Sequence, residues 1–189
     1  MSSPVTRWAK TASGDLWIDP DQDPRRVGPD GTDERSVLTD YLRSYRMTLE
    51  MKCADLDAEQ LARRAVPPST MSLLGLVRHM AEVERGWFRR VMAGQDAPKL
   101  YCTAEAPEED WDGARPDEQV VSQAWQAWRE EVAFAEQYLA QVEDLGSLRD
   151  RHGTPLPLRE IVVHMVEEYA RHCGHADLLR ECIDGRIGQ

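Results

Sequence analysis

The sequence predicts an all-α protein, a four-helix bundle whose second and third helices are joined by a long crossover. Four segments carry apolar residues at spacings of three and four, the period of an amphipathic helix. A strand is indicated only weakly, near Leu16–Ile18. The 189 residues suffice for one domain with its own core. Four helices of similar length therefore favour a bundle.

The first predicted helix runs from Asp33 or Ser36 to Lys52, and a short helix is expected at residues 57–63. The second long helix follows two prolines, which stop anything upstream of it. Either Ser69 or Thr70 can cap its first turn, because a hydroxyl accepts a hydrogen bond from a free backbone amide there. We expect this helix to end at residue 94.

A polar stretch, residues 95–117, separates the second helix from the third. It is long enough to cross the bundle, so neighbouring helices need not be antiparallel. The third helix is predicted from Asp117 to Asp144. The fourth is predicted from Pro157 to Asp184, because proline suits a first helical turn and Gly185 stops the helix.

Residues 1–33 are rich in Asp, Pro, Gly and Arg and lack helical periodicity. We interpret them as an extended arm, and residues 34–189 as the bundle domain. Trp8 and Trp17 indicate that parts of the arm pack against the domain.

Charge and composition exclude several classes of function. The net charge is −11, which argues against a protein that tracks nucleic-acid phosphates. No apolar run has the length of a membrane helix, and the N-terminus lacks the order of a secretory signal. The four cysteines are scattered, as in a cytoplasmic protein with reduced thiols. We therefore predict no nucleic-acid or membrane partner, and a cytoplasmic location.

The fourth predicted helix carries an unusual buried stripe. Its members are spaced three and four residues apart: Leu158, Ile161, Met165, Glu168, His172, His175 and Leu179. The stripe thus places Glu168, His172 and His175 among core residues, whereas Arg171 and Arg180 are expected in solvent. Burying such polar groups without a partner is costly, so a compensating interaction is required.

A divalent metal is one such interaction. Glu168 and His172 are one helical turn apart and aim at one point, and facing helices of bundles build metal sites in this way. His79 in the second helix, beside Met80 and Val83, is the expected third ligand. The alternatives are a metal-free polar network around Glu168 and His172, and a core role for His79.

Other polar residues receive lesser roles. His175 is a candidate base or orienting group one turn beyond His172, or a rim residue, and His164 is expected beside the site. His152 is expected as a solvated loop residue. Glu82, one turn after His79, is a candidate support of the site, although a pair in solvent with Arg78, Arg85 or Arg89 is favoured. Cys173 neighbours His172 but points away on a helix, so we do not expect it to bind metal.

Two segments, MSLLGLVRHMAEVERGWFRR and HMVEEYARHCGHADLLRECIDG, resemble the DinB-like superfamily of metal-binding four-helix proteins, in particular its actinobacterial branch. The resemblance covers residues 33–188. It implies a crossover between the second and third helices and a metal held by His79, Glu168 and His172. In having a glutamate, Glu168, as the first ligand of the pair on the fourth helix, the chain is similar to the mycothiol-dependent maleylpyruvate isomerases. Those enzymes have an additional C-terminal domain, and we do not carry over their reaction.

Two histidines and a carboxylate leave coordination positions open, as in catalytic zinc sites, although nickel or iron accepts the same ligands. A thiol bound there would lose its proton and become a nucleophile. The resemblance suggests that this thiol is mycothiol, or bacillithiol or glutathione in other lineages. We therefore predict a thiol S-transferase that acts on an electrophilic small molecule.

Three alternatives remain open at this point. They are a thiol-dependent isomerase, a non-catalytic metal-binding protein, and a stress-related interaction protein. Trp111, Trp125 and Trp128 are expected to be exposed, and they favour a homodimer.

Overall fold

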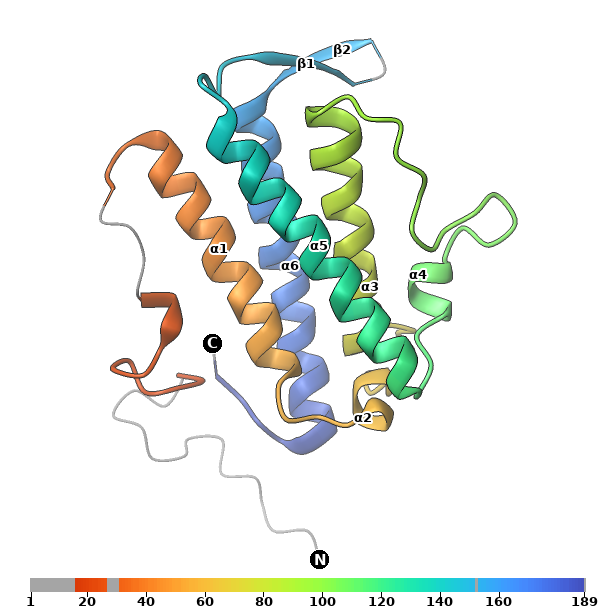
Figure 1. The fold of residues 1–189 in the computed structure, drawn as a ribbon. Helices are drawn as coiled ribbons and strands as arrows, with labels where there is room; N and C mark the ends of the chain where they lie inside the picture. The colour runs from red at the N-terminus through yellow and green to blue at the C-terminus, as the bar shows by residue number, and fades with distance from the viewer. Residues whose placement is uncertain (1–15, 27–30, 152, 189) are drawn as a thin grey trace, which may run out of the picture.

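The computed structural model describes residues 16–26, 31–151 and 153–188, and it confirms the all-α bundle (Figure 1). The long helices are α1 (Glu34–Cys53), α3 (Leu73–Glu84) continued by the π-helix η2 (Arg85–Met92), α5 (Glu118–Gln141) and α6 (Leu158–Asp184). The short ones are η1 (Pro24–Arg26), α2 (Ala58–Ala62) and α4 (Glu109–Asp112).

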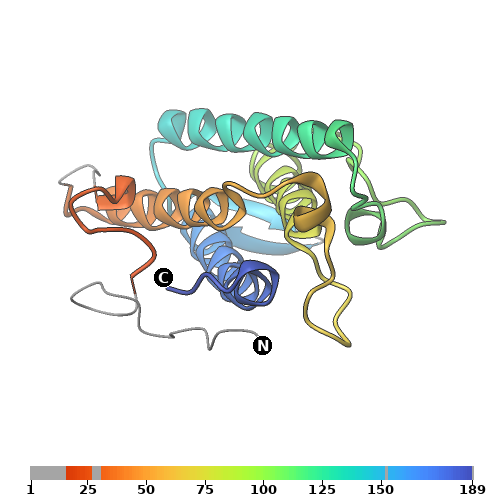
Figure 2. The ribbon, with the colours of Figure 1, turned by 90° about the horizontal axis from the view of Figure 1, so that it is seen from below.

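The predicted crossover joins η2 to α5. The chain returns along the side of α3 through α4, so α3 and α5 run in the same direction (Figure 1). α1 packs against α6 and α3 packs against α5, while α3 also contacts α6 (Figure 2). The crossover therefore lies beside α3, the helix that carries His79.

The second long helix begins later than predicted. Its N-cap is Ser72, whose side chain accepts a hydrogen bond from the amide of Gly75. Ser69 and Thr70 are not caps, because Ser69 closes the turn that contains Pro67 and Pro68 and the helix has not yet begun. In that turn the Ser69 amide donates to a carbonyl and its hydroxyl accepts from Met71.

A two-stranded hairpin, which the sequence did not predict, caps the bundle between α5 and α6. β1 (Leu148–Arg151) pairs antiparallel with β2 (Thr154–Pro157). The hairpin shows no apolar alternation because most of its residues face solvent, and Gly153 allows the turn with a φ of 86°. His152 lies outside the described residues. The strand expected near residues 16–18 is wrong, since that segment is coil and bends.

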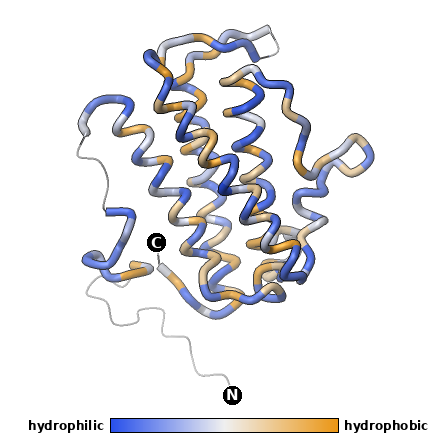
Figure 3. The backbone as a smooth tube through the Cα atoms, in the orientation of Figure 1, coloured by the Kyte–Doolittle hydropathy of each residue, from blue (hydrophilic) through white to orange (hydrophobic). Residues whose placement is uncertain are grey.

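Apolar side chains from all four long helices meet in one core, and apolar and polar residues alternate along each helix (Figure 3). Trp128 belongs to this core at 3% exposure, so the expectation that it is exposed is wrong. Trp111 and Trp125 are half-buried and pack against the core.

Trp17 is 7% exposed and packs beneath three cations, which confirms that this part of the chain is packed. Lys52, Arg180 and Arg186 lie 4.0, 5.3 and 3.7 Å from the centre of its ring. Arg180 is itself buried and donates to the backbone carbonyl of Lys52, so the expectation that it is solvated is wrong. Trp8 lies outside the described residues.

Within the part of the chain that the structure describes, none of the helices combines the length and apolar character needed to cross a bilayer.

Candidate metal centre

His79 from α3 meets Glu168 and His172 from α6. Each offers one ligand atom, and the three atoms all lie within 4.8 Å of one another. His172 Nε2 is 3.5 Å from Glu168 Oε2, close to the roughly 3.4 Å that separates two ligands of a tetrahedral zinc. The rings of His79 and His172 are 4.9 Å apart. The geometry and the donor atoms fit a divalent cation.

The triad lies at the edge of the core. Along α6, Tyr169 and Cys173 are buried, whereas Glu168, His172 and His175 are half-buried. The predicted stripe is therefore displaced by about one residue at these turns. The apolar members of the same stripe, Leu158, Ile161, Met165 and Leu179, are buried, so the stripe leaves the core only at the turns that carry its polar residues.

The crossover supplies a residue that orients His79. Asp110 in α4 places Oδ2 2.8 Å from His79 Nδ1, and its side chain is 6% exposed. Burial by itself would raise the pKa of Asp110, but hydrogen bonds from His79 and Cys102 lower it below its usual range. With Nδ1 engaged, Nε2 of His79 is left for a ligand. A carboxylate behind a metal-binding histidine is a recurring arrangement.

Trp111 covers the other side of His79. The two rings stack with their centres 4.6 Å apart. Neither Asp110 nor Trp111 was predicted at this site, because both lie in a polar connection whose acidic residues follow no pattern. No signal in the sequence separates Asp110 from its acidic neighbours.

Two further side chains of α3 hold the crossover in place. Arg78 donates to the backbone carbonyls of residues 109 and 110, at 2.7 and 2.9 Å. Glu82 accepts from the backbone amides of residues 100 and 101, at 2.8 to 3.0 Å. The expectation that Glu82 pairs with an arginine in solvent is therefore wrong. Its carboxylate satisfies backbone donors that the irregular crossover leaves without partners.

The surroundings of His172 favour its neutral form, in which a ring nitrogen has a lone pair for a metal ion. Burial, with the neighbouring His79, His175 and Arg171, lowers the pKa of His172 to about 4. The Nδ1 atoms of His175 and His172 are 3.4 Å apart, within reach of a hydrogen bond whose proton either ring can carry. His175 thus contacts the Nδ1 side of His172, while Nε2 faces Glu168.

His164 lies on the outer side of the triad, as expected. Its Nε2 is 3.3 Å from Glu168 Oε1, and its ring packs edge-on to Trp87 with centres 4.6 Å apart. A hollow of about 410 Å³ opens beside it, lined by His164, Glu167, Glu168, Ala170 and Arg171. Solvent and small molecules therefore reach Glu168 from this side.

Cys173 plays no part in the triad, as expected. Its Sγ atom points to the backbone carbonyl of Tyr45 at 3.6 Å, and burial raises the pKa of its thiol to about 12. All four cysteines are free.

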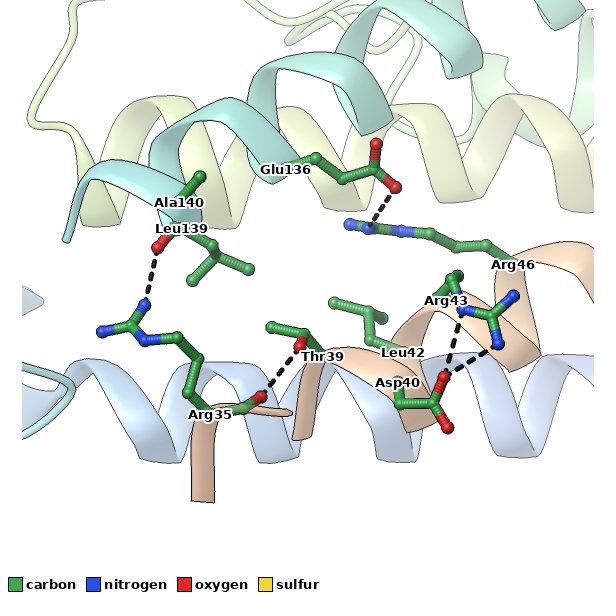
Figure 4. A pocket seen from close by; sticks show the side chains of 9 residues that line it. All are labelled: Arg35, Thr39, Asp40, Leu42, Arg43, Arg46, Glu136, Leu139 and Ala140. Atoms are coloured by element: carbon green, nitrogen blue, oxygen red, sulfur yellow. Dashed lines mark hydrogen bonds and ion pairs between the residues drawn. The ribbon is translucent and has the colours of Figure 1, made fainter. Parts of the chain in front are cut away.

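A separate hollow of about 260 Å³ lies between α1 and α5, away from the triad (Figure 4). Its arginines already have partners. Arg35 donates to the carbonyl of Leu139, Arg43 to Asp40, and Arg46 to a buried glutamate. The hollow therefore offers an apolar floor without free charged groups, and we do not assign the chemistry to it.

The family model of the mycothiol-S-transferases matches residues 37–185. The chain belongs to this family. Membership confirms the DinB-like resemblance and gives the chain a mycothiol S-transferase type of role, with a low-molecular-weight thiol as partner.

Among solved structures, the chain is similar to a conserved protein of Enterococcus faecalis. The TM-score is 0.58 at 18% identity, over 82% of this chain and 99% of the other. At this identity the likeness concerns the fold alone. None of the curated proteins matches the chain.

Proposed function

We propose that this mycothiol-S-transferase family member is a metal-dependent enzyme that joins the thiol to an electrophilic small molecule. The observation that supports this most strongly is the triad, whose three ligand atoms lie within 4.8 Å of one another in a half-buried position. His79, Glu168 and His172 would hold a divalent cation, zinc in preference to nickel or iron. When bound, the cation supplies a Lewis acid that lowers the pKa of a thiol at an open coordination position.

The surrounding residues would organise the reactants. Asp110 fixes the ring of His79, and His175 fixes that of His172, so that each Nε2 faces the triad. In the reaction the thiol sulfur forms a bond to the electrophilic carbon, the bond from that carbon to its leaving group breaks, and the leaving group departs as an anion while the thiol proton passes to a base. His164 is placed at the open side for this transfer. We assign His175 the positioning role because it lies behind His172.

The remaining expectations extend this proposal. We propose that residues 34–189 form the DinB-like four-helix bundle domain with residues 1–33 as an arm, that the protein acts in the cytoplasm, and that it forms a homodimer. A thiol-dependent isomerase and a non-catalytic metal-binding protein are the competing functions. All of these functions use the triad, and they differ in whether, and into what product, the protein converts a substrate.

Metal content separates these functions from a metal-free bundle. Untagged protein should carry near-stoichiometric zinc, nickel or iron by plasma mass spectrometry, and His79→Ala, Glu168→Gln and His172→Ala should each lose it. Glu181→Gln is the matched control, since this exposed glutamate of α6 belongs neither to the triad nor to the lining of the hollow beside Glu168. Wild type that remains metal-free after incubation with zinc would overturn the proposal.

Turnover is then measured with mycothiol and 1-chloro-2,4-dinitrobenzene, in which the sulfur displaces chloride and the thiol proton is released. We expect product formation by the metal-loaded wild type and the Glu181→Gln variant only. Metal binding without turnover on this and other electrophiles would favour the non-catalytic function.

A further inference from the structure

A hollow of about 440 Å³ lies one helical turn from the triad, between η2 and the hairpin. Its lining is Val83, Gly86, Trp87, Arg90, Val91, Gln95, Asp150 and Arg151. This volume falls within the range of small-molecule sites, roughly 300–1,000 Å³. The hollow is distinct from the opening beside Glu168.

Contacts between side chains connect the hollow to the triad. Trp87 in its wall packs against His164, and His164 Nε2 is 3.3 Å from Glu168 Oε1. Val83 lies one turn beyond His79 on α3. Trp87 and His164 therefore link the wall of the hollow to Glu168 of the triad.

The charges in the hollow are unusual for so acidic a chain. Arg85 and Arg89 in the same π-helix both bind Glu131, at 2.7 and 2.5 Å. Arg90 has no ion pair or side-chain hydrogen bond within the described residues, and Arg151 lies 4.3 Å above the ring of Trp87 without a carboxylate partner there. Two guanidinium groups thus face one hollow uncompensated, apart from Asp150.

Asp150 limits the charge that the hollow accepts. Its Oδ1 accepts from the amide of Gly153 in the hairpin turn, at 3.1 Å. Two arginines against one carboxylate leave one formal positive charge, which suits a monoanion. The planar guanidinium fork matches a carboxylate in particular.

The π-helix gives the hollow its room. Its wider turns recur at functional sites. A Cβ atom built on Gly86 would meet no atom within 4 Å, so the glycine leaves an open space in the wall. A larger side chain at this position would fill the hollow without displacing the fold.

We propose that this hollow binds the electrophilic substrate, a small organic molecule with a carboxylate that Arg90 and Arg151 hold. The assignment rests on the proposed function, because it names the substrate class of the same reaction. The apolar body of the molecule lies along Trp87, Val83 and Val91, and its reactive carbon points towards His164 and the triad.

Binding of 2-naphthoate, measured by calorimetry, tests the hollow directly. We expect binding that weakens roughly 10-fold or more in an Arg90→Gln/Arg151→Gln double variant and in Gly86→Leu. The neutral 2-naphthalenemethanol should bind to the wild type at least as weakly as 2-naphthoate binds to these variants. Arg63→Gln is the matched control, an exposed arginine without a carboxylate partner among the described residues, located beyond α2. Gly86→Leu tests the hollow without removing a charge, and circular dichroism checks that each variant folds.

Each arm decides for or against the carboxylate. Undetectable binding at millimolar 2-naphthoate, or equal binding by all variants, would overturn the proposal, and so would tighter binding of 2-naphthyl phosphate. The titrations are repeated on metal-free protein. Binding there that depends on both arginines supports the hollow even if thiol transfer fails. Conversely, thiol transfer to chlorodinitrobenzene without any arginine-dependent binding of 2-naphthoate would support the proposed enzyme function and overturn the proposal that the hollow binds a carboxylate substrate.

Discussion

Two inward-facing carboxylates, Glu84 on α3 and Glu168 on α6, have opposite surroundings. Glu84 is fully buried, and Arg46 donates to both of its oxygens at 2.8 and 2.7 Å. The hydroxyl of Tyr169 donates a third bond at 2.7 Å, and it accepts from Trp128 Nε1. The side chain of Glu168 is 28% exposed, and its nearest partners are histidine nitrogens at 3.3 and 3.5 Å.

The difference shows how one bundle separates structure from chemistry. A buried charge with all its hydrogen bonds satisfied holds helices in register and offers nothing to a ligand. A half-buried charge whose neighbours lie at the limit of hydrogen bonding keeps lone pairs available. Because Tyr169 follows Glu168 directly in α6, adjacent residues serve the two purposes.

The largest expected effect distinguishes the two carboxylates. Glu84→Gln should lower the free energy of unfolding by about 3–5 kcal/mol, because it leaves the buried Arg46 without its counter-charge. Glu168→Gln should cost less than about 1 kcal/mol in metal-free protein, yet abolish metal binding. Urea unfolding in the presence of chelator, with metal analysis of both variants, makes the comparison. Equal losses of stability would remove the distinction.

The pH dependence of stability tests the triad without metal. The pKa of His172 is about 4 in the folded protein against 6.5 for a free histidine, so the unfolded chain binds a proton more readily between these values. His172 should therefore leave the free energy of unfolding unchanged above pH 6.5 and lower it by about 1–3 kcal/mol as the pH decreases to 4. The His172→Gln variant should lose less over this range. The free energies of unfolding are measured in urea at each pH. The same pH dependence in the variant and the wild type would contradict the expectation.

Asp110 extends the comparison to the support of the triad. Asp110→Asn should weaken zinc binding roughly 10- to 100-fold, because His79 loses the carboxylate that orients it. Asp112→Asn is the control, since that side chain is 63% exposed and its ion pair is with Arg64. Competition with a chromogenic chelator measures both affinities. An unchanged Asp110→Asn affinity would show that Trp111 and the helix alone position His79.

The smallest expected effect concerns the rim of the buried network. Glu136 is 57% exposed and lies 3.7 Å from Arg46, which keeps both bonds to Glu84. Glu136→Ala should change the free energy of unfolding by less than about 0.5 kcal/mol. A loss close to that of Glu84→Gln would mean that Arg46 depends on both carboxylates.

The four helices, the crossover and the candidate ligands could be predicted from the residues alone. Apolar spacing locates four helices because burial of one face imposes a period near 3.6, and the one-turn spacing of Glu168 and His172 is a local property of a helix. The residues quoted for the DinB-like resemblance carried the family. Local rules also placed Cys173 away from the triad.

Which polar residues serve the site and which serve the core depends on how the helices and the crossover pack together. Asp110 reaches His79 across 31 residues of chain, and Glu84 meets Arg46 across 38. Such partners depend on how the crossover and the helices pack, which no local spacing encodes. Glu82, Arg180 and Trp128 were misplaced for the same reason, because burial of a polar or aromatic group is set by partners distant in sequence.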